Sequence, residues 1–96
     1  MKIRFKYFGD TSFAKGTGKI VIAYSGNKVG VAFCSPDDKF NKHYGRGLAI
    51  LRLIESPTYI YEFPQNDGDW MSIIEEKIDY PNWFNALKWD ILTGRF

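Results

Sequence analysis

The sequence predicts a small α+β domain in which an antiparallel sheet of about four strands packs against one long helix, followed by two short C-terminal helices. Three observations support this fold class. Residues 1–8 alternate apolar and basic side chains, residues 19–33 form two apolar runs around a compact turn, and residues 36–55 carry a helical pattern of apolar side chains. Because 96 residues are enough for one hydrophobic core, we expect a single domain over residues 1–96.

The strands follow from periodicity and turn chemistry. In residues 1–8, apolar side chains alternate with Lys and Arg, which is the period of a strand with one face in solvent. Residues 19–33 are predicted as a hairpin, because Ser25-Gly26-Asn27-Lys28 is a turn signal between two apolar runs. Residues 58–63 are β-branched and aromatic, so they are predicted as a fourth strand.

The long helix follows from its capping residues. Ser35 is a predicted N-cap, Pro36 suits the first helical position, and the two aspartates that follow place carboxylates near the positive end of the helix dipole. These signals predict a helix from Pro36 to about Glu55, which a proline two residues later ends. The apolar spacing near residues 70–78 and 83–91 predicts the two short helices.

A helical wheel sorts the long helix into three faces. An apolar stripe, which we predict to pack against the sheet, consists of Phe40, Tyr44, Gly47, Leu48, Leu51 and Ile54. A basic face that passes into Ile50 and Leu53 consists of Lys39, Lys42, His43 and Arg46. A third face of small and polar residues consists of Asp38, Asn41, Gly45, Ala49 and Arg52.

The third face has two possible explanations, and the sequence leaves both open. Gly45 and Ala49 lie one turn apart, and the glycine costs the helix about 1 kcal/mol of propensity. Small side chains permit close packing against a neighbouring helix or a second subunit. Alternatively, guanidinium groups bind phosphates bidentately and stack on rings, which favours a phosphate or base site formed by Arg46, Arg52, Asn41 and Lys42.

Composition and charge exclude several classes of protein. The formal net charge of +2 is not the strongly basic balance of a protein held mainly by phosphate charge, so nucleic-acid binding would rest on a local patch. A single Cys excludes an internal disulfide, and one His with one Cys cannot form a structural zinc site. We therefore expect neither a metal nor a cofactor. No signal peptide or transmembrane run is recognisable, which favours a cytoplasmic location and no membrane partner.

The sequence does not predict an enzyme. Cys34 lies at a strand end before a helix, a position that can activate a thiol, but His43 is two helical turns further along a regular helix and is out of reach. We interpret Cys34 as a small apolar residue. No carboxylate dyad or other nucleophile–base pair is recognisable.

The aromatic content is high, with eight Phe, six Tyr and three Trp residues. This is more aromatic bulk than so small a core can bury in full. Exposed aromatic side chains in a small protein mark a self-association surface, a partner interface or a platform on which bases stack. Homo-oligomerisation is the expectation we favour, because such interfaces commonly bury aromatic surface.

The block Ala32 to Leu53 resembles small phage and prophage proteins in its Ala-Phe-Cys-Ser-Pro start, its Gly-Arg pair and its final Arg-Leu. Within that group it is similar to the Thoeris anti-defence sponge proteins, oligomers that sequester cyclic ADP-ribose-type signals in the host cell. The resemblance implies that Arg46 and Arg52 face the phosphates. It also implies that Phe40 or Tyr44 packs behind them and that Arg95 comes from a second subunit.

The sequence therefore leads to a non-enzymatic anti-defence protein that sequesters a cyclic ADP-ribose-type or cyclic nucleotide signal, or that docks on a host defence protein. The residues expected to bind the ligand are Arg46, Arg52, Asn41, Lys42, His43, Phe40, Tyr44 and Arg95. A nucleic-acid-binding module is the alternative, in which the basic face follows phosphates while Trp or Tyr residues stack on bases. A third possibility is a subunit whose aromatic C-terminal helices dock onto a partner enzyme.

Overall fold

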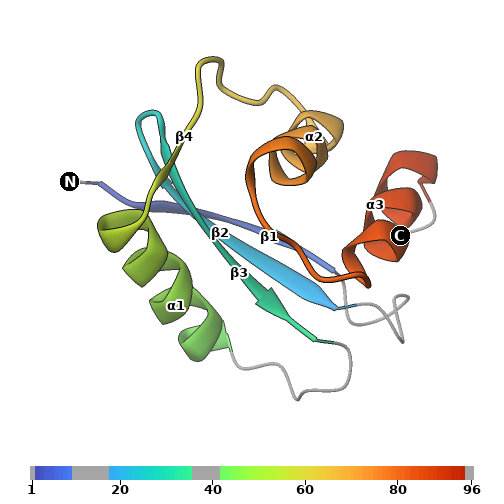
Figure 1. Cartoon of the computed structure of the whole chain (residues 1–96), viewed down its shortest axis with the longest axis horizontal. Helices are drawn as coiled ribbons and strands as arrows, with labels where there is room; N and C mark the ends of the chain where they lie inside the picture. Colours follow the sequence, from blue (N-terminus) through green and yellow to red (C-terminus); the bar gives the residue numbers. More distant parts are fainter. Residues whose placement is uncertain (1, 10–17, 36–41, 95–96) are drawn as a thin grey trace.

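A computed structural model describes residues 2–9, 18–35 and 42–94, and within them the chain forms a four-stranded antiparallel sheet and three helices. Figure 1 shows α1 on one face of the sheet and α2 with α3 on the other. The strand order is β1-β2-β3-β4. The elements in chain order are β1 (Arg4–Phe8), β2 (Lys19–Ser25), β3 (Lys28–Cys34), α1 (Lys42–Glu55), β4 (Thr58–Tyr59), α2 (Asp67–Lys77) and α3 (Phe84–Thr93).

The predicted α+β class is thus confirmed, whereas the prediction of one long helix is not. Helix α1 has 14 residues, against 11 for α2 and 10 for α3, and it begins at Lys42 rather than at Pro36. Residues 36–41, which include the predicted first turn, lie outside the described residues. The fourth strand is also shorter than predicted, because β4 pairs only with Lys28 and Val29 at the start of β3.

The β2–β3 hairpin confirms the predicted turn. Its two central residues are Gly26 and Asn27, and Ser25 pairs with Lys28 across it. Gly26 has φ 58°, whereas no described residue other than glycine has a positive φ. This combination matches the type II′ turn, which needs glycine at its first central position and whose twist suits a hairpin. The turn fixes the register between β2 and β3.

The sheet buries a different kind of side chain on each face. On the α2–α3 face the core is built from large side chains, namely Phe8, Ile20, Ile22, Val29, Val31, Ile60, Trp70, Met71, Ile74, Phe84 and Leu87. On the α1 face the core is smaller and consists of Val21, Ala23, Ala32, Ala49 and Leu53, with Ile3, Phe5, Leu48 and Ile50 packed at its border. The predicted inward faces of the two C-terminal helices are confirmed by the burial of Trp70, Ile74, Phe84 and Leu87.

Helix α1 lies on the sheet through its small residues, and the prediction that its apolar stripe packs inward is wrong. Gly45 and Ala49 are buried, whereas Tyr44 is 73% exposed and Ile54 is 63% exposed. The reason is a close approach at Gly30 of β3, where an added Cβ would collide with the backbone of Ala49 and Leu53. Only small side chains on both elements allow this spacing, so the small face turns inward and the large apolar side chains turn outward.

Within the described residues, no helix is both long enough and apolar enough to cross a membrane.

Candidate functional site

The structure describes some of the predicted site residues but not all of them. Phe40, Asn41 and Arg95 lie outside the described residues, and Lys42 is described only as the first residue of α1. The other four, which all belong to α1, are His43, Tyr44, Arg46 and Arg52. His43 and Tyr44 are exposed near the start of the helix, and the two arginines make defined contacts with the sheet.

The two arginines lie on different sides of α1. Arg52 follows Arg46 by six positions, which places their side chains about 120° apart around the helix axis. The guanidinium carbon of Arg46 lies 4.3 Å from the ring centre of Phe5 on β1, at one edge of the sheet. Arg52 donates a hydrogen bond from Nη1 to the carbonyl of Val31 on β3, at 2.6 Å. The structure therefore does not bring Arg46 and Arg52 together on one ligand.

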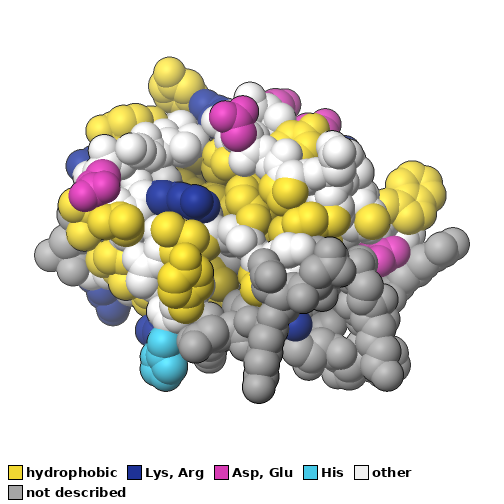
Figure 2. Space-filling model, turned by 60° about the horizontal axis from the view of Figure 1, so that its bottom comes forward, with side chains coloured by type: hydrophobic (Ala, Val, Ile, Leu, Met, Phe, Trp, Pro, Cys, Tyr) yellow, Lys and Arg dark blue, Asp and Glu magenta, His cyan; other side chains and the backbone are white. Residues whose placement is uncertain are grey.

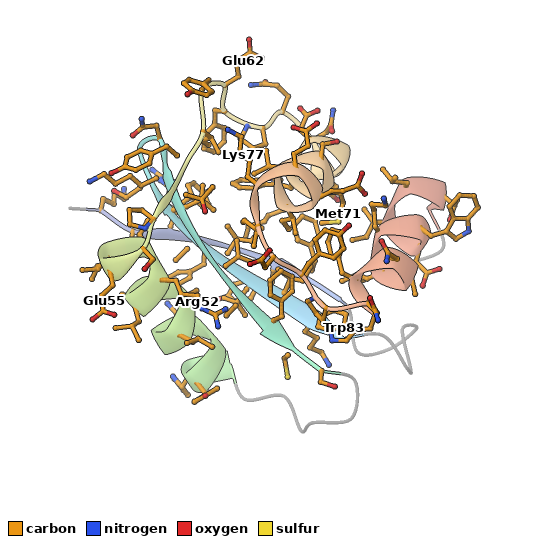
Figure 3. The ribbon with its side chains drawn as sticks, in the orientation of Figure 1. Arg52, Glu55, Glu62, Met71, Lys77 and Trp83 are labelled. Carbon is orange, nitrogen blue, oxygen red and sulfur yellow. The ribbon has the colours of Figure 1, made fainter. Side chains whose placement is uncertain are left out.

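Arg52 lies at an open part of the sheet edge. Because β4 pairs only with the start of β3, the outer edge of β3 beyond Val29 is not covered by a strand in the described part of the chain. Backbone groups alternate in direction along a strand, so the carbonyl of Val31 points outward there and accepts from Arg52. Figure 3 shows Arg52 directed from α1 toward the sheet, whereas Glu55 points away.

A cleft of about 380 Å³ opens at this edge, and we call it the Arg52 cleft. Its apolar part comes from β3 and from the end of α2, and its polar rim combines one cation, one carboxylate and two hydroxyls. The lining residues are Val29, Gly30, Val31, Phe33, Arg52, Ser56, Thr58, Ile78 and Asp79. Figure 2 shows this face hollowed between α1 and the C-terminal helices, with hydrophobic side chains in the hollow. The volume is at the lower end of the range for small-molecule sites.

The bond to Val31 fixes the Arg52 guanidinium at the cleft. A guanidinium has five N–H donors, and this contact uses one of them. The remaining donors suit an anion, since a planar fork matches the spacing of phosphate or carboxylate oxygens. A carboxylate at Asp79 and hydroxyls at Ser56 and Thr58 line the same cleft, so it can also accept hydrogen bonds from hydroxyl or amino groups.

Arg46 belongs to a second arrangement, which we call the Phe5–Arg46 stack. The rings of Phe5 and Tyr7 are stacked along β1, with centroids 6.3 Å apart and an interplanar angle of 21°. Tyr7 is 39% exposed, and Arg46 lies over Phe5. A cation and exposed ring faces on one surface can bind a base or another flat ring by stacking.

A larger groove of about 670 Å³ lies between residues 60–65 and α2. Two of its charged side chains are already engaged within the protein. Lys77 donates to the carbonyl of Tyr59 at 3.3 Å, and the Asp69 carboxylate accepts from the backbone N–H of Gln65 at 2.8 Å. Figure 3 shows Lys77 and Glu62 on the side of the molecule away from α1. The other polar side chains that line this groove are Tyr61, Glu62, Gln65 and Ser72.

Sequence reasoning identified Arg52 but missed its neighbours in the cleft. Thr58 and Asp79 are distant from Arg52 in the chain, and no local pattern links them. The alternation of residues 1–8 placed Phe5 and Tyr7 on one face of a strand, but it did not indicate that this face lies close to Arg46 of α1.

Cys34, the residue that the sequence offered as a candidate nucleophile, is half-buried at the end of β3.

No group of three or more His, Cys, Asp or Glu side chains that could hold a metal ion occurs among the described residues. No protein-family model, curated protein or solved structure matches the chain. The geometry of the two arginine sites is therefore the feature that indicates a function.

Proposed function

We propose that this protein is a non-enzymatic binding protein that captures a small anionic ligand of the nucleotide class in the Arg52 cleft. The observation that carries the proposal is the 2.6 Å bond from Arg52 to Val31, which holds a guanidinium at the rim of a cleft of about 380 Å³. An arginine held in this way loses less conformational entropy when it binds an anion than a freely moving side chain does.

The chemistry of the cleft favours a ligand with three kinds of group. A phosphate would bind the free donors of Arg52, and ribose hydroxyls would donate to Asp79. The apolar surface of Phe33 and Ile78 would receive a flat or partly apolar part of the ligand. A nucleotide carries all three features, whereas inorganic phosphate carries only the first. Cyclic ADP-ribose-type signals, which the resemblance to anti-defence sponges implies, belong to this class. On that basis the protein would act in the cytoplasm of an infected host cell.

Isothermal titration with ADP-ribose, cyclic ADP-ribose, cyclic dinucleotides and inorganic phosphate tests the proposal. Arg52→Gln keeps an amide donor for Val31 and removes the charge, so we expect an affinity loss of about 10- to 100-fold, as for a lost charge-assisted hydrogen bond. Arg46→Gln is the matched control on the same helix and should leave nucleotide binding unchanged.

Asp79→Asn separates nucleotide recognition from simple anion binding. The change removes a negative charge, so we expect weaker binding of ribose-containing ligands and equal or tighter binding of inorganic phosphate. If no nucleotide binds, or if Arg52→Gln binds as well as the wild type, the proposal is wrong.

A second candidate function is favoured by the Phe5–Arg46 stack, namely the binding of single-stranded nucleic acid. A base would stack on the exposed ring of Tyr7 while Arg46 contacts the backbone phosphates. This binding would weaken steeply as salt concentration rises. It would be reduced by Tyr7→Leu and by Arg46→Gln but not by Arg52→Gln, which is the reverse of the pattern expected for the Arg52 cleft.

A further inference from the structure

The outer edge of β3 places a backbone donor in the Arg52 cleft that the protein itself does not use. In an antiparallel ladder, the N–H and the C=O of one residue point to the same side of the strand. The carbonyl of Val31 accepts from Arg52 at this edge, so the N–H of Val31 points into the same cleft. Strand β4 does not reach it, because its pairing with β3 ends at Val29. The Val31 N–H therefore has no hydrogen-bond partner among the described residues.

This unused donor calls for an explanation, because buried backbone N–H groups are almost always paired. Val31 is only 4% exposed. Val29, two residues earlier, presents its backbone to the same side and is paired with Thr58 in β4. A buried donor without a partner costs the fold free energy. An acceptor on a ligand in the cleft would remove this cost when it binds.

Two hydroxyl groups add further donors to the cleft. Ser56 lies between α1 and β4, Thr58 is the first residue of β4, and both line the cleft. Neither hydroxyl forms a hydrogen bond with a described residue. Because a hydroxyl can donate as well as accept, the cleft has donors from α1, from the edge of β3 and from the chain that enters β4.

The two charged side chains of the cleft determine where an anion would lie. Arg52 enters from α1 on one face of the sheet, whereas Asp79 follows α2 on the other face (Figure 1). An anion is attracted by the guanidinium and repelled by the carboxylate. It would therefore lie on the Arg52 side of the cleft, against the edge of β3 where the Val31 N–H is unpaired.

We propose that Arg52, the Val31 N–H and the hydroxyls of Ser56 and Thr58 form a phosphate subsite that selects phosphate over carboxylate. This inference rests on the proposed function, in which the ligand is a nucleotide, and identifies the groups that hold its phosphate. A tetrahedral phosphate presents oxygens in several directions, which suits donors that come from three elements. A carboxylate has two oxygens in one plane, which the fork of Arg52 alone satisfies, and it would leave the other donors unpaired.

Nuclear magnetic resonance of the isotope-labelled protein tests the subsite one amide at a time. Inorganic phosphate and ADP-ribose should each move the amide proton of Val31 downfield, because it gains a hydrogen bond to an anion. The amide of Val29 is the internal control, since it is already paired with Thr58 and should move little. At about pH 6, inorganic phosphate and acetate both carry mostly one negative charge, and acetate should bind at least about 10-fold more weakly.

Substitutions test the hydroxyls. Thr58→Val keeps the shape of the side chain and removes its hydroxyl, so phosphate and ADP-ribose should bind about 2- to 10-fold more weakly. Ser56→Ala should have an effect of the same size. Ser72→Ala is the matched control, because it removes a hydroxyl from the groove beside α2 and should leave binding unchanged. Circular dichroism verifies that the variants are folded.

Three results would each overturn the subsite: a Val31 amide that phosphate leaves unmoved, acetate that binds as tightly as phosphate, or full phosphate affinity in a protein that carries both Ser56→Ala and Thr58→Val. If ADP-ribose still binds in those cases and Arg52→Gln weakens its binding, the proposed function stands without the subsite. If phosphate moves the Val31 amide and no nucleotide binds, the subsite stands and the proposed function is wrong. The two proposals can therefore fail separately.

Discussion

Substituting Gly30 by alanine should strongly destabilise the fold, because α1 rests on this residue. An added Cβ would lie 2.9 Å from Leu53 Cα and still closer to the backbone of Ala49, where ordinary contacts are 3.4–4 Å. The helix must therefore retreat by about 1 Å, since carbon atoms attract best at about 3.5–4.0 Å. The obstructing atoms are backbone, which cannot rotate away as a side chain can. Overpacking of this kind costs about 1–3 kcal/mol, and we expect the upper part of that range.

Urea unfolding followed by tryptophan fluorescence and by circular dichroism measures this effect. A loss of about 2–3 kcal/mol corresponds to a melting temperature about 10–20 °C lower for a domain of this size. Gly47→Ala is the control, because it adds the same methyl group to an open position and should raise the stability of the monomer by up to about 1 kcal/mol. If the free energies of unfolding of Gly30→Ala and the wild type differ by less than about 0.5 kcal/mol, α1 does not pack closely on Gly30 of β3.

Three further predictions concern single contacts. Arg52→Ala should cost about 1 kcal/mol through loss of its bond to β3, and Arg52→Gln should cost less; chemical unfolding compares the two. Asn66 caps α2, and its side-chain oxygen accepts a hydrogen bond from the N–H of Asp69 at 2.9 Å. Asn66→Ala removes this cap and should cost about 1 kcal/mol of stability, whereas Asn66→Asp keeps the cap and should be nearly neutral in the same assay. Asp67→Asn breaks the exposed ion pair with Lys6, at 3.1 Å, and should change stability by less than about 1 kcal/mol. If the difference in stability between variant and wild type persists in 1 M salt, the pair is not a screened surface ion pair.

The sheet was predictable because its signals are local. The hairpin turn needs glycine at one position, and Gly26 stands there between two apolar runs. The short C-terminal helices were predictable for the same reason, since each shows one apolar face and the buried residues Trp70, Ile74, Phe84 and Leu87 lie on it. In these elements, hydrophobic periodicity and burial agree.

The orientation of α1 was not predictable from its own sequence. A helical wheel ranks faces by hydrophobicity, and by that measure the face with Tyr44 and Leu51 should lie inside. Contact between α1 and the sheet depends instead on how closely the backbone of Ala49 and Leu53 approaches Gly30, which is a matter of shape shared by two elements distant in the chain. The expected convergence of Arg46 and Arg52 depended on the same orientation, and with α1 turned as it is they contact opposite edges of the sheet.

A single close contact thus determines where Arg52 lies. With Gly30 against Ala49 and Leu53, the helix is rotated so that Arg52 reaches the carbonyl of Val31 and the side chains of Leu51 and Ile54 face outward. A helix turned to bury Tyr44 and Leu51 would carry Arg52 away from β3. The substitution that most directly tests the fold, Gly30→Ala, should therefore weaken nucleotide binding as well as stability, whereas Arg52→Gln should weaken nucleotide binding at little cost in stability.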